Sequence, residues 1–159
     1  MEPETVKTAR RTVELFLHLI NSSLDENDRW RKGGWIHIND PDGNVVLHER
    51  LGEIAFLENN AMYQSLSAEK SSRLRGHPDY RTSWQSREPE HDRYGGAIRT
   101  SNGYIFSFSG LPELWDEALM LAIASWSVPR LGYEVEKIAS PGVLDLFMTI
   151  MAIDDHVDD

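Results

Sequence analysis

The stretch YGGAIRTSNGYIFSFSGLPELWDEAL, residues 94–119, decides the fold of this chain. Asn102 and Gly103 form a strong hairpin signal, because Asn-Gly suits the central positions of a tight β-turn. The turn separates a strand at residues 97–100 from a strand at residues 104–110. Side chains alternate along the second strand, so its aromatic residues point one way and its serines the other. The aromatic residues are Tyr104, Phe106 and Phe108, and Ile105, Ser107 and Ser109 share the opposite face.

A helix follows this hairpin directly. Pro112 suits the first turn of a helix, and Glu113 and Asp116 place acidic groups at its positive end. Small and apolar residues then recur at helical spacing, which is typical of a helix that lies tightly on a sheet. They are Leu114, Ala118, Leu121, Ala122 and Ser125. A last helix is predicted to begin near Pro141.

The N-terminal half has the same order of helix and hairpin. An apolar stripe predicts a first helix, with Val6, Ala9, Val13, Phe16, Leu17 and Ile20 on one side. A hairpin follows, from GWIHIND (residues 34–40) through PDGN to VVLHERLG (residues 45–52). A three-residue loop pairs Asn39 with Val45 and His37 with Leu47. This register puts His37 and His48 on opposite faces, so they cannot share a ligand.

Residues 53–75 are predicted to form a helix that ends at Gly76 and Pro78. Its stripe comprises Ile54, Leu57, Ala61, Ser65 and Ala68. The segment at residues 77–96 has no periodicity, and such segments carry function or mobility more often than regular elements do. Antiparallel hairpins between helices predict an α+β protein with a single antiparallel sheet of four to five strands and helices packed on it.

Composition limits the class of protein. The 159 residues fit one domain, residues 1–159, and a formal net charge of −10 disfavours nucleic acid as a partner. The absence of cysteine excludes disulfides, thiolate metal sites and cysteine catalysis. No signal-peptide pattern and no run of roughly 18 apolar residues is present, so a soluble, cytoplasmic protein without a membrane partner is expected.

Several motifs share an order and spacing. A strand ends at Asp40, with Gly43 three residues on and Arg50 ten residues on. Later come a Gly-Gly pair, a glycine turn, a Ser-Gly strand end and a small-residue helix, at Gly95, Gly96, Gly103, Ser109, Gly110, Asp116 and Ala118. With these motifs the chain resembles the GlcG/HbpS-like (haem-binding-protein-like) family over residues 5–126. Residues 129–159 form an additional C-terminal helix and acidic tail.

The resemblance implies a profilin-like α+β fold, self-association, and binding of a small molecule or a tetrapyrrole, with haem as a candidate cofactor. The aromatic residues also favour self-association. If the predicted helices do not cover both faces of the sheet, an aromatic face stays exposed and would serve as an oligomer interface. These residues are Trp35, Tyr104, Phe106, Phe108, Trp115 and Trp126. A homo-oligomer is therefore expected.

The candidate ligand site lies where the last strand becomes a helix. Exposed amides at Ser109, Gly110 and Leu111 would bind an anionic group such as a carboxylate, beside the start of the neighbouring strand at Tyr94, Gly95 and Gly96. Arg99 or Arg50 would supply a bidentate partner, and His91 is the candidate axial ligand of a haem. The alternative interpretation is that these glycines serve only the backbone path.

Nothing in the sequence assigns a catalytic residue or a metal site. The six histidines lack metal-binding spacing, and SFSG around Ser109 lacks the GxSxG frame. The preferred function is therefore a soluble domain that binds or senses a small anionic molecule or tetrapyrrole. One alternative is an oligomeric scaffold without a ligand. The other is an enzyme acting on a small hydroxy acid or related metabolite, with Arg50 or Arg99 holding the carboxylate.

Overall fold

The computed structural model describes residues 3–127 and 138–157. Its helices are α1 (Pro3–Ile20), α2 (Leu57–Arg75), α3 (Glu113–Ser127) and α5 (Val143–Val157). Its strands are β1 (Arg31–Asn39), β2 (Val45–Ile54), β3 (Ala97–Arg99) and β4 (Ile105–Ser109). The strands form one antiparallel sheet in the order β2-β1-β4-β3. The predicted α+β class with a single antiparallel sheet is confirmed.

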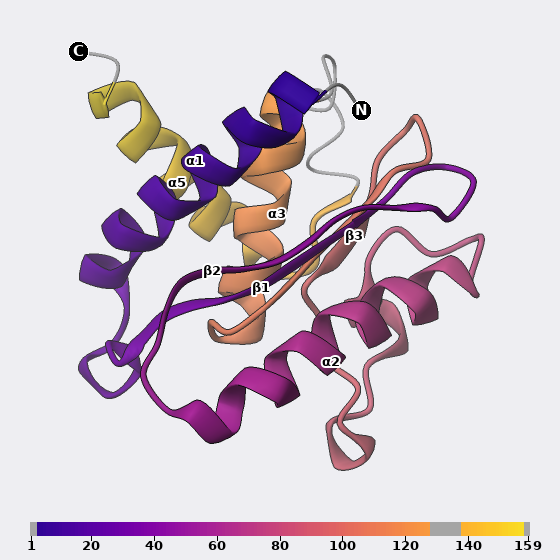
Figure 1. The fold of residues 1–159 in the computed structure, drawn as a ribbon, viewed down its shortest axis with the longest axis horizontal. Helices are drawn as coiled ribbons and strands as arrows, with labels where there is room; N and C mark the ends of the chain where they lie inside the picture. The colour runs from indigo at the N-terminus through magenta and orange to yellow at the C-terminus, as the bar shows by residue number, and fades with distance from the viewer. Residues whose placement is uncertain (1–2, 128–137, 158–159) are drawn as a thin grey trace.

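Helices cover both faces of this sheet (Figure 1). Helices α1, α3 and α5 lie on one face, and α2 lies on the other together with the irregular segment at residues 76–96. The expected C-terminal helix is present as α5. Residues 128–137, which precede it, and the acidic side chains from Asp154 onward lie outside the described residues.

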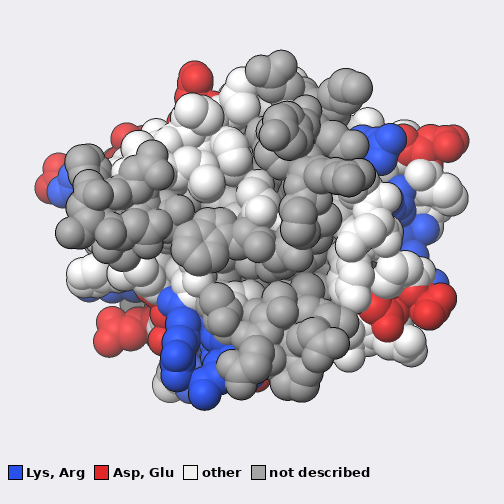
Figure 2. All heavy atoms as spheres, turned by 90° about the horizontal axis from the view of Figure 1, so that it is seen from above, with Lys and Arg blue, Asp and Glu red and all other residues white. Residues whose placement is uncertain are grey.

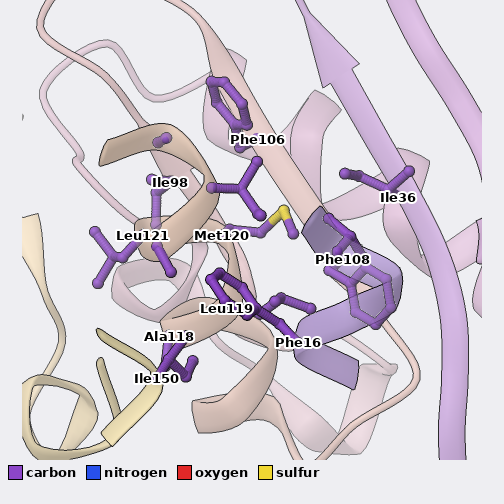
Figure 3. Close-up of a cluster of buried hydrophobic side chains, with 14 of the residues drawn as sticks. Phe16, Ile36, Ile98, Phe106, Phe108, Ala118, Leu119, Met120, Leu121 and Ile150 are labelled. Atoms are coloured by element: carbon purple, nitrogen blue, oxygen red, sulfur yellow. The ribbon is translucent and has the colours of Figure 1, made fainter. Parts of the chain in front are cut away.

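The main core lies between the sheet and the three-helix face (Figure 3). The rings of Phe106 and Phe108 on β4 point into it and are fully buried, as is Phe16 of α1. The predicted α1 stripe is confirmed, because Ala9, Val13, Phe16, Leu17 and Ile20 are all buried and Val6 packs against the core while partly buried. The helices therefore cover the phenylalanines of β4. Because helices cover both faces of the described sheet, no exposed sheet face supports the homo-oligomer, which stays a prediction. The side chain of Trp126 lies outside the described residues.

The predicted stripe of the second helix is wrong. β2 continues to Ile54, α2 begins at Leu57, and the Leu57 side chain is 84% exposed. The buried residues of α2 are Tyr63, Ser67, Lys70, Ser71 and Leu74. This mostly polar face fits the serine-bearing face of β4, where the Ser107 hydroxyl donates to the Ser67 carbonyl at 2.8 Å. A search for apolar periodicity does not detect such a face, because paired polar groups replace apolar ones there.

The predicted register of the first hairpin is also wrong beyond its first pair. Asn39 pairs with Val45 as expected, but an irregularity between Ile38 and Asn39 makes His37 pair with His48. One extra residue in a strand turns all later side chains to the other face. His37 and His48 consequently share a face, with 2.9 Å between their Nδ1 atoms.

Charged side chains are mixed on the described surface. On the face seen in Figure 2, the described Lys and Arg side chains lie in separate groups with Asp and Glu side chains near them. The described part of this face shows no continuous basic area of the kind that binds nucleic acid. None of the helices described has the length and apolar character needed to cross a bilayer.

Candidate functional site

A cavity of about 290 Å³ lies beside the junction of β4 and α3. Ser109, Gly110 and Leu111 line it, so the junction predicted from sequence does border a cavity. Met62 and Leu66 of α2 and Pro112 add apolar wall. A larger hollow of about 680 Å³ lies against the second half of α2. Two of its arginines are already held in ion pairs, Arg73 with Glu69 and Arg87 with Glu113.

A buried ion pair forms the inner wall of the cavity. Lys70 Nζ lies 3.2 Å from Asp116 Oδ2 and donates to the Phe108 carbonyl at 2.8 Å. Both side chains are almost completely buried, with 2% and 3% exposed. Burial raises the pKa of Asp116 to about 6, while Lys70 and the Leu111 amide counteract part of this rise.

The Leu111 amide is not free to donate to a ligand, contrary to the prediction from the sequence. It donates to Asp116 Oδ1 at 2.8 Å, so the protein's own carboxylate already occupies the position expected for a bound anion. The reason is local, because an acidic residue five positions on in the chain folds back over the start of its own helix. The Leu111 amide is therefore not available to an anion in the cavity.

Three side-chain donors on the cavity have unused hydrogen-bonding capacity. Arg31 Nε is buried and makes no hydrogen bond with the described residues, although Arg31 Nη1 reaches the Gly110 carbonyl at 3.4 Å. The Tyr63 hydroxyl has no hydrogen-bond partner among the described residues, and burial raises its pKa. Lys70 uses two of its three N–H groups on Phe108 and Asp116.

The glycines at the start of β3 have structural roles in the wall behind this cavity. The Gly95 amide donates to Glu113 Oε2 at 2.8 Å, and Gly96 has φ +126°. A Cβ on Gly96 would lie 2.8 Å from Lys70 Nζ. Tyr94 lines the cavity. Gly96 thus allows the backbone to pass close to the Lys70–Asp116 pair, whereas a Cβ on Gly95 would lie 2.8 Å from the Trp84 ring.

Three residues predicted for the site lie elsewhere. The Arg99 guanidinium donates to the carbonyls of Leu74, His77, Pro78 and Tyr80, all within 3.1 Å. Arg50 is exposed on β2, opposite Trp35. His91 is exposed and contacts Glu88 at 2.9 Å. None of the three lines the cavity.

Sequence reasoning missed Arg31, Tyr63 and Lys70 and gave Asp116 only a role at a helix end. Lys70 and Tyr63 are on α2, whose buried face was predicted incorrectly, and Arg31 precedes the strand predicted to begin at Gly34. The available signal was a lysine and a tyrosine seven residues apart, which lie on one helix face. That signal is too common to identify a site.

The cavity beside the junction of β4 and α3 does not fit a haem. No histidine is among the residues that line the cavity. Its volume of about 290 Å³ also lies at the small end of ligand pockets, which span about 300–1,000 Å³.

Comparisons with family models, with curated proteins and with solved structures each gave no match to this chain.

Proposed function

We propose that this protein binds a small carboxylate with a short apolar tail in the cavity between α2, β4 and α3. The observation that carries the proposal is the convergence of unused donors on one small cavity with an apolar wall. Arg31 Nε, the Tyr63 hydroxyl and the third N–H of Lys70 are the donors. Of these, Arg31 Nε is buried without a hydrogen bond to the described residues, which is costly, and an acceptor-rich ligand would remove that cost.

Two of the three carboxylates that line the cavity are paired with basic side chains, Asp116 with Lys70 and Glu113 with Arg87. The third, Asp92, has no ion pair among the described residues and accepts a hydrogen bond from the Tyr94 hydroxyl at 3.5 Å, so an anion must bind on the side of the cavity that Arg31 and Lys70 line. Arg31 has a weaker carboxylate neighbour, since its Nε lies 3.6 Å from Asp28 Oδ1. Arginine binds carboxylates strongly because its planar guanidinium presents parallel N–H groups. The side chains of Met62 and Leu66 would contact the alkyl part of the ligand.

The proposal extends to a binding or sensing role in the cell, and it replaces the tetrapyrrole by a smaller ligand. A cavity of about 290 Å³ holds a molecule of only several heavy atoms beside its donors. Affinity is therefore expected to rise from acetate through propionate to butyrate, as each methylene buries apolar area worth about 0.8 kcal/mol.

Titration of the full chain with acetate, propionate and butyrate, followed by amide NMR, tests this proposal. We expect saturable shifts around Ser109, Gly110 and Leu111. Tyr63→Phe, which removes only the hydroxyl, is expected to weaken binding roughly tenfold, in line with about 1–1.5 kcal/mol for one hydrogen bond. Tyr80→Phe is the matched control, because Tyr80 lines the other hollow. Absence of saturable binding by all three acids would refute the proposal and favour the ligand-free scaffold.

A further inference from the structure

A pair of histidines on the β1–β2 hairpin lies apart from the carboxylate site. His37 and His48 are directly opposite each other on the two strands, and 2.9 Å separates their Nδ1 atoms. The ring planes meet edge to face, with centroids 4.7 Å apart. Neither residue lines the cavity between α2, β4 and α3.

We propose that His37 and His48 bind one divalent transition-metal ion, Cu²⁺ in preference to Zn²⁺, through their two Nδ1 atoms. Metal–imidazole bonds are about 2.0–2.1 Å long. Two such bonds ending 2.9 Å apart enclose an angle of about 90° at the metal. This is the angle of the square-planar and tetragonal sites that Cu²⁺ and Ni²⁺ prefer, whereas tetrahedral Zn²⁺ needs ligand atoms about 3.3 Å apart. Cu²⁺ also has the highest affinity of the divalent series for such ligands.

The surroundings prepare His37 as a ligand. Its side chain is buried, and burial together with His48 lowers its pKa, although a hydrogen bond with Asn39 opposes this change. A lower pKa favours the neutral imidazole, which is the form that binds metal ions. Asn39 in turn is hydrogen-bonded to Ser71 of α2 and to the Gly43 carbonyl, so the group beside His37 is fixed. Such supporting contacts orient metal-binding histidines in proteins.

His48 provides access for the ion. It is only partly buried and belongs to β2, an edge strand of the sheet. Water can therefore complete the coordination of an ion bound by two protein nitrogens. In the free protein one imidazole donates its Nδ1 proton to the other, and binding moves that proton to Nε2 of the same ring, so no proton is released. The formal net charge of −10 attracts cations.

Calorimetric titration of the full chain with Cu²⁺ at pH 7.5 tests this site. We expect one equivalent to bind, with Ni²⁺ and Zn²⁺ weaker. His48→Gln is expected to weaken Cu²⁺ binding by at least about a hundredfold, since loss of a supporting contact alone costs 10–100-fold. His77→Gln is the control, because His77 is an exposed histidine stacked on Tyr80. Unchanged affinity in folded His48→Gln, or no saturable binding by the unmodified chain, would overturn the proposal.

A second measurement does not depend on the variant. Paramagnetic Cu²⁺ broadens the NMR signals of nearby nuclei, so substoichiometric Cu²⁺ on the unmodified chain should first remove the amide signals around His37 and His48. Trp35 should also lose fluorescence, because its ring centroid is 4.9 Å from that of His48. Selective broadening at Glu88, Glu90 and His91, whose ligand atoms also lie close together, would assign the ion to that exposed loop and refute the hairpin site.

Discussion

Lys70 and Asp116 are 46 residues apart in the sequence, yet Lys70 Nζ lies 3.2 Å from Asp116 Oδ2 in the interior. The lysine belongs to the helix on one face of the sheet and the aspartate to a helix on the other. The pair therefore joins the two layers at the end of β4, where the Phe108 carbonyl also accepts from Lys70. The candidate carboxylate site is built around this connection.

Asp116→Ala should destabilise the protein strongly. The substitution leaves the Lys70 ammonium buried without its counter-charge, a change that costs about 3–5 kcal/mol. The double variant Lys70→Met/Asp116→Leu should recover much of that loss, because apolar residues of similar size remove both charges together. Urea unfolding of the three variants measures the difference. A loss below about 1 kcal/mol for Asp116→Ala would show that water reaches the pair.

Gly96→Ala should disturb the same pair from the opposite side. A Cβ there would lie 2.8 Å from Lys70 Nζ and from the Phe108 carbonyl oxygen, and φ is +126°. Both effects are unfavourable for alanine, so we expect a loss of about 2 kcal/mol in urea unfolding. Gly76→Ala is the control, since its nearest contact is 3.4 Å and its φ is −72°. Equal effects of the two substitutions would contradict the expected clash.

Arg99→Gln separates structural roles from binding roles. The Arg99 guanidinium donates to the carbonyl of Leu74 in the last turn of α2, and to those of His77, Pro78 and Tyr80 beyond the helix. We expect a loss of about 1–3 kcal/mol in stability, as for hydrogen bonds to a charged group. Carboxylate affinity should stay unchanged, because Arg99 does not line the cavity. Weaker carboxylate binding by the folded variant would restore the role first predicted for Arg99.

The parts of the fold that could be predicted from the sequence are those with local signals. The apolar stripe that ends at Ile20 and the Asn102-Gly103 turn act within a few residues, so their elements were predicted correctly. The register irregularity beside Asn39 was not predictable, because it depends on how two strands meet. The polar buried face of α2 was not predictable for a similar reason. Ser67 can be buried there because Ser107 of β4, distant in the sequence, donates a hydrogen bond to its carbonyl.

The candidate site likewise has a part that could be predicted from the sequence and a part that could not. Its backbone at Gly110 and Leu111 was identified because a strand end followed by a helix start is visible in a short stretch. Its donors come from β1 and α2, and only the folded chain brings Arg31 and Lys70 to the cavity. Arg99 does not line this cavity, and the sequence could not show this, because an arginine that binds four carbonyls and one that binds a ligand look identical in a sequence.

Glu117 should make stability depend on pH, in a direction opposite to ordinary acid denaturation. The side chain is fully buried on α3, and its carboxylate accepts hydrogen bonds from the Ser140 amide and hydroxyl, both at 2.8 Å. Burial raises its pKa from 4.5 to about 7, although the hydrogen bonds from Ser140 and Thr82 oppose the rise. Between pH 4.5 and 7 the folded state therefore binds more protons at this group than the unfolded state does.

The contribution of Glu117 to stability is consequently complete below pH 4.5 and is lost as the pH rises through about 7. The loss amounts to about 3 kcal/mol over that window. The glutamine in Glu117→Gln cannot ionise, so this variant should not lose that stability as the pH rises. Relative to the unmodified chain, its free energy of unfolding should therefore rise by that amount between pH 4.5 and 8. Urea unfolding at several pH values measures it, with exposed Glu14→Gln as the control. A difference independent of pH would mean that Glu117 stays ionised throughout, with Ser140 and Thr82 offsetting its burial.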